Sequence, residues 1–93
     1  MKFLAMCSTG LGSSFMVRMN IEEVLAELGV GGVEVDHSDI GSASAASADV
    51  FFVARDLAET AEGLGDVVVL NSIIDREELR EAVKDAAVRK GLL

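Results

Sequence analysis

The chain has 93 residues, of which 51% are hydrophobic, and sixteen acidic against eight basic residues give it a formal net charge of −8. This length allows one domain with a modest core, and this hydrophobic content indicates a globular rather than a disordered chain. An acidic chain that has no basic run, no tryptophan and no tyrosine is a poor candidate for binding nucleic acid.

One cysteine and one histidine are present. They allow neither an internal disulfide nor a zinc site of the usual kind, so we expect no metal and no cofactor. A lone thiol fits a reducing compartment, and no apolar run approaches the ~20 residues that span a bilayer. The apolar run after Lys2 is too short for a signal peptide. We therefore expect a soluble cytoplasmic protein.

The first half of the chain predicts a strand, a helix and a second strand. Residues 2–6 form a short apolar run that is typical of a buried strand. After residue 14, apolar residues recur at helical spacing until Gly29, which occupies a C-cap position. Residues 33–37 alternate as in an edge strand, and the Ser-, Ala- and Gly-rich segment 38–47 predicts a loop with a short helix. The inner stripe of the helix comprises Val17, Ile21, Val24, Leu25 and Leu28.

The second half predicts two more strands and two helices. Residues 49–54 are continuously apolar, as in a central strand, and residues 67–70 form another strand of the buried kind. Between them, residues 57–64 predict a weak helix. Asp75 is a good N-cap for a helix over residues 76–89. Its inner stripe comprises Leu79, Val83 and either Ala86 or Ala87.

This alternation of strands and helices predicts a parallel sheet with helices on both faces. We predict a single doubly wound α/β domain over residues 1–93, with a four-stranded parallel sheet in the order 2-1-3-4. In such folds the ligand binds at the carboxyl ends of the strands, near the point where the strand order reverses. The segment that follows the first strand lies at that edge.

Cys7 opens this segment, which reads Cys7-Ser8-Thr9-Gly10-Leu11-Gly12-Ser13-Ser14. Backbone N–H groups in such a phosphate-loop-like turn converge on an anion, and the start of the helix adds positive potential. The same field favours the nucleophilic thiolate, so we expect a lowered pKa for the thiol of Cys7. Ser13 and Ser14 either cap the helix, contact a bound phosphate, or do both.

Two other phosphate-binding motifs do not fit this segment. A Walker A loop is excluded because no Lys-Ser/Thr pair follows the second glycine. A dinucleotide-binding fingerprint fits poorly because Phe15 occupies the position of its third glycine.

Several polar residues near the expected strand ends are expected to have structural rather than functional roles. The only histidine, His37, is expected to be a structural or surface residue rather than a catalytic one. Asp36, Asp39 and Asp49 form no recognisable metal-binding pattern and read as solvated acids. Arg18 is expected to be a solvated surface charge; the alternative is that it contacts a bound anion or an acidic partner.

Three apolar residues near the loop have no place in the inner stripe: Leu11, Phe15 and Met16. Exposed apolar groups of this kind mark docking sites, so we expect them to contact a partner protein. The alternative is that Phe15 and Met16 pack under the segment 38–47.

The pattern Cys7-x-x-Gly10-x-Gly12-Ser13-Ser14, followed by a Met-rich helix with Arg18, resembles the IIB components of bacterial sugar phosphotransferase systems. The loop is most similar to that of the ascorbate-type branch, and these proteins share a fold with the lactose/cellobiose and galactitol types. The later run Ser47-Ala48-Asp49-Val50 is also similar.

This resemblance implies a phosphoryl carrier. Cys7 accepts the phosphoryl group from a phosphohistidine of a IIA protein and passes it to a sugar, ascorbate or a polyol, bound by the IIC membrane permease. The resemblance further implies that Ser8, Thr9, Gly10, Leu11, Gly12, Ser13 and Ser14 hold the phosphoryl group, mostly through backbone N–H groups. A monomer fits a carrier that docks two partners in turn.

Two alternatives remain open at this point. Low-molecular-weight phosphatases and arsenate-reductase-like enzymes use a similar cysteine loop on a similar fold, but with an arginine beside the final serine. Here that position is Ser13, and the missing cation weighs against hydrolysis. The other alternative is a non-catalytic regulatory module of flavodoxin-like shape.

Overall fold

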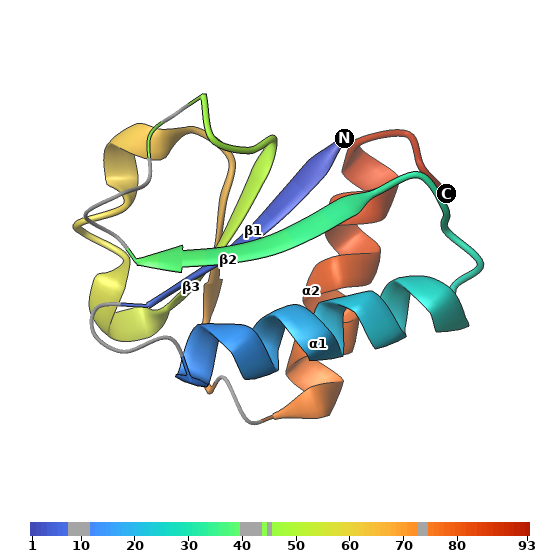
Figure 1. Cartoon of the computed structure of the whole chain (residues 1–93), viewed down its shortest axis with the longest axis horizontal. Coiled ribbons are helices and arrows are strands. Elements are labelled where there is room, and N and C mark those ends of the chain that lie inside the picture. The colour runs from blue at the N-terminus through green and yellow to red at the C-terminus, as the bar shows by residue number, and fades with distance from the viewer. Residues whose placement is uncertain (8–11, 40–43, 45, 73–74) are drawn as a thin grey trace.

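A computed structural model describes residues 1–7, 12–39, 44, 46–72 and 75–93. Four strands, two α-helices and two short 3₁₀ turns follow one another along the chain (Figure 1). In order they are β1 (Lys2–Cys7), α1 (Gly12–Glu27), β2 (Glu34–Asp39), β3 (Val50–Ala54), η1 (Arg55–Leu57), η2 (Glu62–Leu64), β4 (Val67–Leu70) and α2 (Arg76–Arg89). None of the described helices is long and apolar enough to cross a membrane.

The four strands form one parallel sheet in the order β2-β1-β3-β4, which confirms the predicted order. At one end of the ladder Cys7 pairs with Asp39 of β2. One residue earlier, Met6 pairs with Val53 of β3, which in turn pairs with Val69 of β4. Because all strands run in the same direction, their carboxyl ends meet at the edge of the sheet where β1 delivers Cys7.

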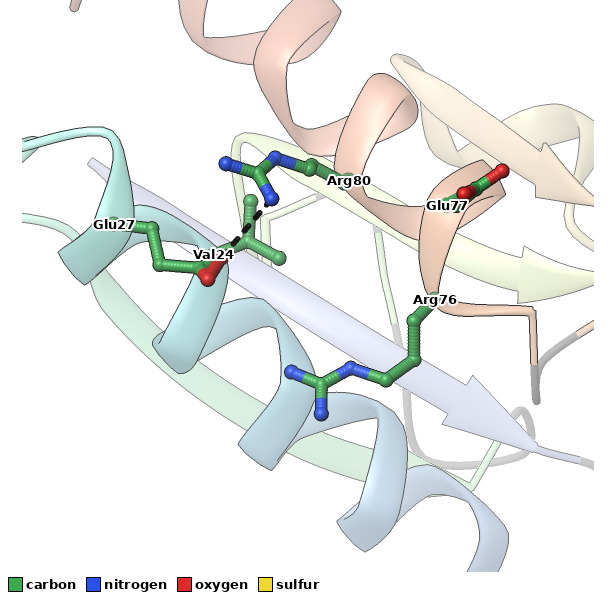
Figure 2. A pocket seen from close by; sticks show the side chains of 5 residues that line it. All are labelled: Val24, Glu27, Arg76, Glu77 and Arg80. Carbon is green, nitrogen blue, oxygen red and sulfur yellow. Dashed lines mark ion pairs between the residues drawn. The ribbon is translucent and has the colours of Figure 1, made fainter.

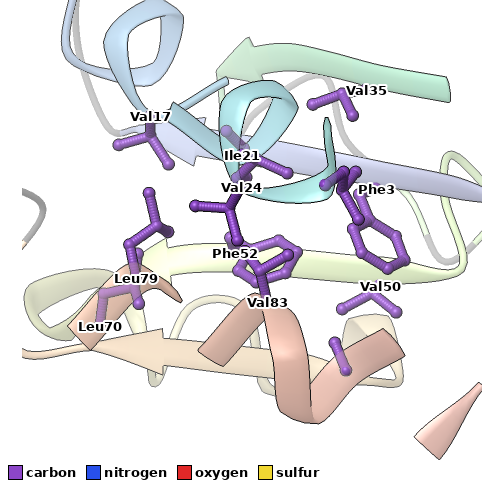
Figure 3. Close-up of a cluster of buried hydrophobic side chains, with 13 residues drawn as sticks. Phe3, Val17, Ile21, Val24, Val35, Val50, Phe52, Leu70, Leu79 and Val83 are labelled. Carbon is purple, nitrogen blue, oxygen red and sulfur yellow. The ribbon is translucent and has the colours of Figure 1, made fainter. Parts of the chain in front are cut away.

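The side chains of the sheet alternate between two unequal apolar clusters. Phe3 and Phe52, with ring centroids 5.5 Å apart, belong to the larger cluster, which α1 and α2 cover (Figure 3). Leu4 and Phe51 belong to the smaller cluster on the opposite face, which the η1–η2 segment covers through Leu57. Both α-helices thus lie on one face, and among the described residues the helical elements on the other face are the two 3₁₀ turns (Figure 1).

The single helix expected over residues 57–64 is therefore wrong. Two 3₁₀ turns, η1 and η2, stand at its ends, joined by a turn over residues 58–61. Only Leu57 and Ala61 are buried in this segment, and eight residues with so small an apolar stripe do not recover the cost of nucleating an α-helix.

Helix α1 is placed as its apolar spacing predicts. Its stripe is buried, except that Leu28 lies just beyond the helix and is only partly buried. Gly29 has a φ of +74° and closes the helix: its N–H donates to Ala26 at 3.1 Å, and that of Val30 donates to Leu25 at 2.9 Å. This pair of bonds is a Schellman motif, and it confirms the predicted C-cap glycine.

Helix α2 begins at the predicted cap. The carboxylate of Asp75 accepts hydrogen bonds from the N–H groups of Glu77 and Glu78, at 3.0 and 3.1 Å. Both Ala86 and Ala87 are buried together with Leu79 and Val83, so the inner stripe includes both alanines.

Ion pairs bridge the outer surfaces of α1 and α2 across a cleft of about 270 Å³ (Figure 2). Arg80 lies 3.8 Å from Glu27, and Arg76 pairs with Glu23. Arg76 lies in the first turn of α2, where the helix dipole disfavours a positive charge. Glu27 lies in the last turn of α1, where the dipole disfavours a negative charge. The ion pair with the other helix offsets this unfavourable position in each case. These arginines therefore pair with α1, not with acids of their own helix.

The two edges of the sheet differ in character. Strand β2 runs to Asp39, two residues past its expected end, and is the expected polar edge strand. Strand β4 is the other edge, as the predicted order requires, but it is not buried as its apolar run predicts, because Val69 keeps 44% of its surface exposed. Its apolar composition resembles that of a central strand, but no further strand of the described chain covers it.

Candidate functional site

Cys7 is the last residue of β1, and α1 begins five positions later at Gly12. This places the cysteine at the carboxyl edge of the sheet, directly before a helix start, as the sequence predicts. Residues 8–11 join the two elements and lie outside the described residues. The predicted phosphate ligands Ser8, Thr9, Gly10 and Leu11 are among them.

The other three predicted ligands, Gly12, Ser13 and Ser14, form the first turn of α1. Backbone N–H groups in a first helical turn have no partner within the helix, so they are available to an anion. This turn contains no acidic residue that would compete for them. The first turn of α1 therefore has N–H groups without a partner inside the helix, and positive potential, close in sequence to the thiol-bearing residue.

A cluster around His37 ties α1 to β2 near this edge. The ring of His37 meets that of Phe15 edge to face, with centroids 5.4 Å apart, and its side chain is 18% exposed. Nδ1 of His37 lies 3.5 Å from Nη1 of Arg18. A guanidinium only donates, so this contact fits a neutral ring with its proton on Nε2. The histidine is thus a half-buried bridge between α1 and β2, in line with the structural reading.

Arg18 is neither a free surface charge nor a described contact of Cys7. Its Nε lies 3.4 Å from the carboxylate of Glu22 on the next helical turn. The same buried Nε has no partner in hydrogen-bond geometry within the described part of the chain. Arg18 therefore joins Glu22 on α1 to His37 on β2.

The three aspartates considered as metal ligands have separate structural settings. Asp36 accepts from the N–H of His37 at 2.8 Å, and Asp49 accepts from the N–H of Lys2 at 2.7 Å. Asp39 ends β2, where its backbone pairs with Cys7. Within the described ranges, no three His, Cys, Asp or Glu side chains are placed to hold a metal ion.

An apolar surface lies on the outer side of the first half of α1. Phe15 is 46% exposed, Met16 40% and Met19 49%. Phe15 touches His37 yet stays exposed, and most of the segment 38–47, under which the alternative would place it, lies outside the described residues. The predicted docking residue Leu11 lies outside the described residues. Sequence reasoning missed Met19, although its spacing from Phe15 and Met16 places all three on one side of the helix.

Arg55 is a second residue that sequence reasoning missed. It follows β3 directly, and β3 is the neighbour of β1, so Arg55 lies at the same edge of the sheet as Cys7. It is exposed and forms no ion pair with a described residue. The signal was available: Arg55 is the first residue after a strand predicted to be central.

Two acids at the same edge already accept backbone hydrogen bonds. Asp75 caps α2, and Glu78 accepts from the N–H groups of Asn71 and Ser72 at 2.8 and 2.9 Å. Both carboxylates are occupied as acceptors of backbone hydrogen bonds, which does not suit the proton donor that a phosphatase places beside its leaving group.

Residues 2–85 match the family model described as PTS system, lactose/cellobiose specific IIB subunit. No curated protein matches the chain at a significant level.

Proposed function

Since the chain belongs to the lactose/cellobiose-specific IIB family of the phosphotransferase system, whose members are phosphoryl carriers that act with IIA and IIC partners, we propose that Cys7 carries the phosphoryl group. The observation that supports this assignment is the position of the chain's only cysteine. It ends the first strand at the carboxyl edge, five positions before a helix begins.

The proposed chemistry consists of two displacements at phosphorus. The thiolate of Cys7 attacks the phosphohistidine of the IIA protein, an S–P bond forms, and the P–N bond breaks with its electrons left on the imidazole. A hydroxyl oxygen of the sugar then attacks the phosphocysteine, the S–P bond breaks, and the thiolate is regenerated. The hydroxyl proton passes to a base at the sugar site in the permease.

Backbone groups of the loop hold the phosphoryl group in this proposal. Residues 8–14 surround it, and the unpaired N–H groups at the start of α1 supply donors in fixed positions. Arg55 is the nearest uncommitted cation along the neighbouring strand and helps to attract the phosphorylated donor.

Transfer is favoured over hydrolysis by three features of the chain. Ser13 stands where the related phosphatases have an arginine, and Arg18 is engaged by Glu22 and His37. The acids Asp75 and Glu78 at the same edge are occupied as hydrogen-bond acceptors. A carrier needs its thiophosphate protected from hydrolysis, so a site without a free arginine and without a free acid among these residues suits a carrier.

The partners follow from the same reasoning. Residues 1–93 act as one IIB domain and as a monomer, at the cytoplasmic face of the IIC permease. The IIA protein docks on the apolar surface formed by Leu11, Phe15 and Met16, to which the structure adds the neighbouring Met19. The matched family is named for lactose and cellobiose, but the form of the loop is most similar to the ascorbate-type branch, so we propose ascorbate or a polyol as the sugar.

Phosphorylation by a IIA protein tests the assignment of Cys7. Incubation with phosphorylated IIA is expected to add one phosphoryl group to the peptide that contains Cys7, as read by mass spectrometry. Cys7→Ser is expected to fold normally and to accept no phosphoryl group, because the hydroxyl is far less ionised than the thiol. Phosphoryl transfer by the serine variant would rule out Cys7 as the carrier.

A charge placed on α1 tests the docking surface. Met16→Asp is expected to slow phosphorylation by the IIA protein about tenfold, because a buried interface charge costs on the order of 1–2 kcal/mol. The rate of thiol alkylation by a small reagent is expected to stay unchanged. Val88→Asp, at a 54% exposed valine of α2, is the matched control. Equal slowing in both variants would place the docking surface elsewhere.

A further inference from the structure

A second apolar surface lies on the side of the sheet that α1 and α2 leave open. A cavity of about 390 Å³ lies against β4 and the η1–η2 segment, lined by Ala58, Glu59, Glu62, Gly65, Val67 and Val69. Below, the two valines of this lining, Val67 and Val69, are called its floor, and its two carboxylates, Glu59 and Glu62, are called its rim. The phosphoryl transfer proposed above uses none of these residues.

The strand beneath this cavity is an unusual edge strand. Edge strands of soluble proteins normally carry charges that prevent unwanted pairing, and β2 at the other edge does, with Glu34 and Asp36. The four residues of β4 are Val, Val, Val and Leu, and Val69 remains 44% exposed. An uncharged edge next to an apolar cavity marks a surface that another molecule covers.

The charges around the cavity limit what that molecule is. Asp56, Glu59 and Glu62 form no ion pair with any described residue, in contrast to Asp66, which Arg89 and Lys90 neutralise. Arg55 is the only basic residue between positions 55 and 66. The rim is therefore negative and uncompensated, and it complements a partner segment that carries lysine or arginine together with an apolar side chain.

We propose that this cavity docks a basic cytoplasmic segment of the IIC permease, with an apolar side chain of the permease seated on Val67 and Val69. The cytoplasmic loops of membrane proteins carry an excess of lysine and arginine, which matches the negative rim. Anionic lipid repels the same rim, so the permease and not the bilayer is the occupant. The inference rests on the carrier function proposed above.

The position of the cavity allows the permease to bind there without covering Cys7 or α1. Val69, Val53 and Met6 lie in one row across the sheet, and Cys7 follows Met6. Two strand spacings, about 10 Å, therefore separate the floor of the cavity from β1. The IIA docking surface on α1 covers the opposite face of the sheet. The permease thus holds the carrier by β4 and reaches the Cys7 loop along the edge, while α1 stays accessible.

Binding to the permease can be measured without phosphoryl transfer. We would sediment the protein with vesicles that contain the IIC permease of its own system, and with otherwise identical permease-free vesicles. Val69→Lys is expected to weaken the permease-dependent binding about tenfold, because an added cation meets a basic partner and an apolar contact is lost. Val88→Lys adds the same charge at an exposed valine of α2 and is expected to bind as the wild type does.

A second pair of variants tests the rim. Glu59→Gln with Glu62→Gln is expected to weaken binding about threefold to tenfold and to reduce its dependence on salt. Glu77→Gln with Glu81→Gln removes the same charge from α2 and is the matched control. The proposal is overturned if the β4 variant and the rim variant bind the permease vesicles as the wild type does. It is also overturned if each α2 control loses as much binding as the variant that it matches. It is also overturned if Val69→Lys abolishes a self-association of the chain and leaves vesicle binding unchanged, since a second copy is then the occupant.

These outcomes separate the docking proposal from the assignment of Cys7. Phosphorylation of each variant by the IIA protein is measured in parallel and is expected to match the wild type. If Val69→Lys disrupts permease binding but Cys7 takes no phosphoryl group, the docking surface is kept and the phosphocysteine is rejected. If Cys7 is phosphorylated normally and Val69→Lys leaves permease binding unaffected, the phosphocysteine is kept and the docking surface is rejected.

Discussion

The two α-helices of this protein lie side by side on one face of the sheet, yet they begin in opposite ways. Helix α2 begins with a closed end: Asp75 occupies two of its N–H groups, and Glu77 and Glu78 add negative charge to its first turn. Helix α1 begins without any acid in its first turn, directly after the cysteine-bearing end of β1. The first turn of α2 thus has an acceptor from its own cap and two acids, whereas the first turn of α1 has no acid, and in the function proposed above its N–H groups bind the phosphoryl group.

The far end of α2 continues this contrast. Arg89 and Lys90 both reach the carboxylate of Asp66 at the start of β4, at 2.5 and 3.1 Å. Side chains thus fix α2 at both ends, and the described contacts fix α1 through its apolar stripe and its glycine cap. The comparison teaches that side chains of the described residues fix α2 at both ends, whereas the start of α1 has no acid of its own and is the helix start that the proposed function uses. Changes at the start of α1 should therefore affect function, and changes at α2 should affect stability.

Closing the start of α1 with an acid gives the largest expected effect. Ser14→Glu places a carboxylate in the first turn, where it stabilises the helix by about 0.5 kcal/mol through the dipole. The same charge repels the phosphoryl group and raises the pKa of the Cys7 thiol, so phosphorylation by the IIA protein should slow at least about tenfold. Urea unfolding and the phosphorylation rate are expected to change in opposite directions.

Ser14→Gln separates charge from size in this experiment. It has the length of glutamate without the charge, and it is expected to keep most of the phosphorylation rate. If the glutamine variant loses as much activity as the glutamate variant, steric blocking and not the open helix start explains the loss.

Opening the start of α2 is expected to affect stability alone. Asp75→Ala leaves the N–H groups of Glu77 and Glu78 without their acceptor, at a cost of about 1 kcal/mol in the free energy of unfolding. Asp75→Asn keeps a capping oxygen and should lose less than half of this. Phosphorylation of Cys7 should be unchanged in both, and a large loss of activity in Asp75→Ala would contradict the division between the two helices.

The sequence predicts the fold well wherever one local signal decides it. The cap at Asp75, the glycine that closes α1 and the apolar stripes of both helices all depend on nearby residues, and the structure confirms them. The order of the strands was predictable because the Cys7 loop and the buried strands together favour one doubly wound arrangement.

What the sequence did not predict depends on neighbours that are distant in the chain. The run Val67–Leu70 is typical of a buried strand, yet Val69 stays 44% exposed at the edge of the described sheet, where the predicted order also places this strand. The ion pairs of Arg76 and Arg80 with Glu23 and Glu27 join two helices that are far apart in the sequence, so no local pattern predicts them. Likewise, the bridge from Arg18 to His37 joins residues 19 positions apart and has no local signature.

The smallest expected effect concerns the far end of α2 and depends on pH. Burial alone would raise the pKa of Asp66, but hydrogen bonds and charges from Arg89 and Lys90 outweigh it and hold that pKa below its usual value. A carboxyl whose pKa is lowered on folding stabilises the protein above its unfolded pKa of about 3.9, and this contribution is lost as the pH falls through the folded value.

Asp66→Asn is therefore expected to lower the free energy of unfolding by about 1 kcal/mol or less at neutral pH, since the group is partly exposed. The difference from the wild type should shrink as the pH falls below about 4, where the wild-type carboxyl also becomes neutral. Urea unfolding at neutral and acid pH measures this difference. Asp56→Asn, at an acid without an ion pair to any described residue, is the control and should show no such dependence. A pH-independent difference for Asp66→Asn would mean that packing at position 66, and not the charge, holds the end of α2 to β4.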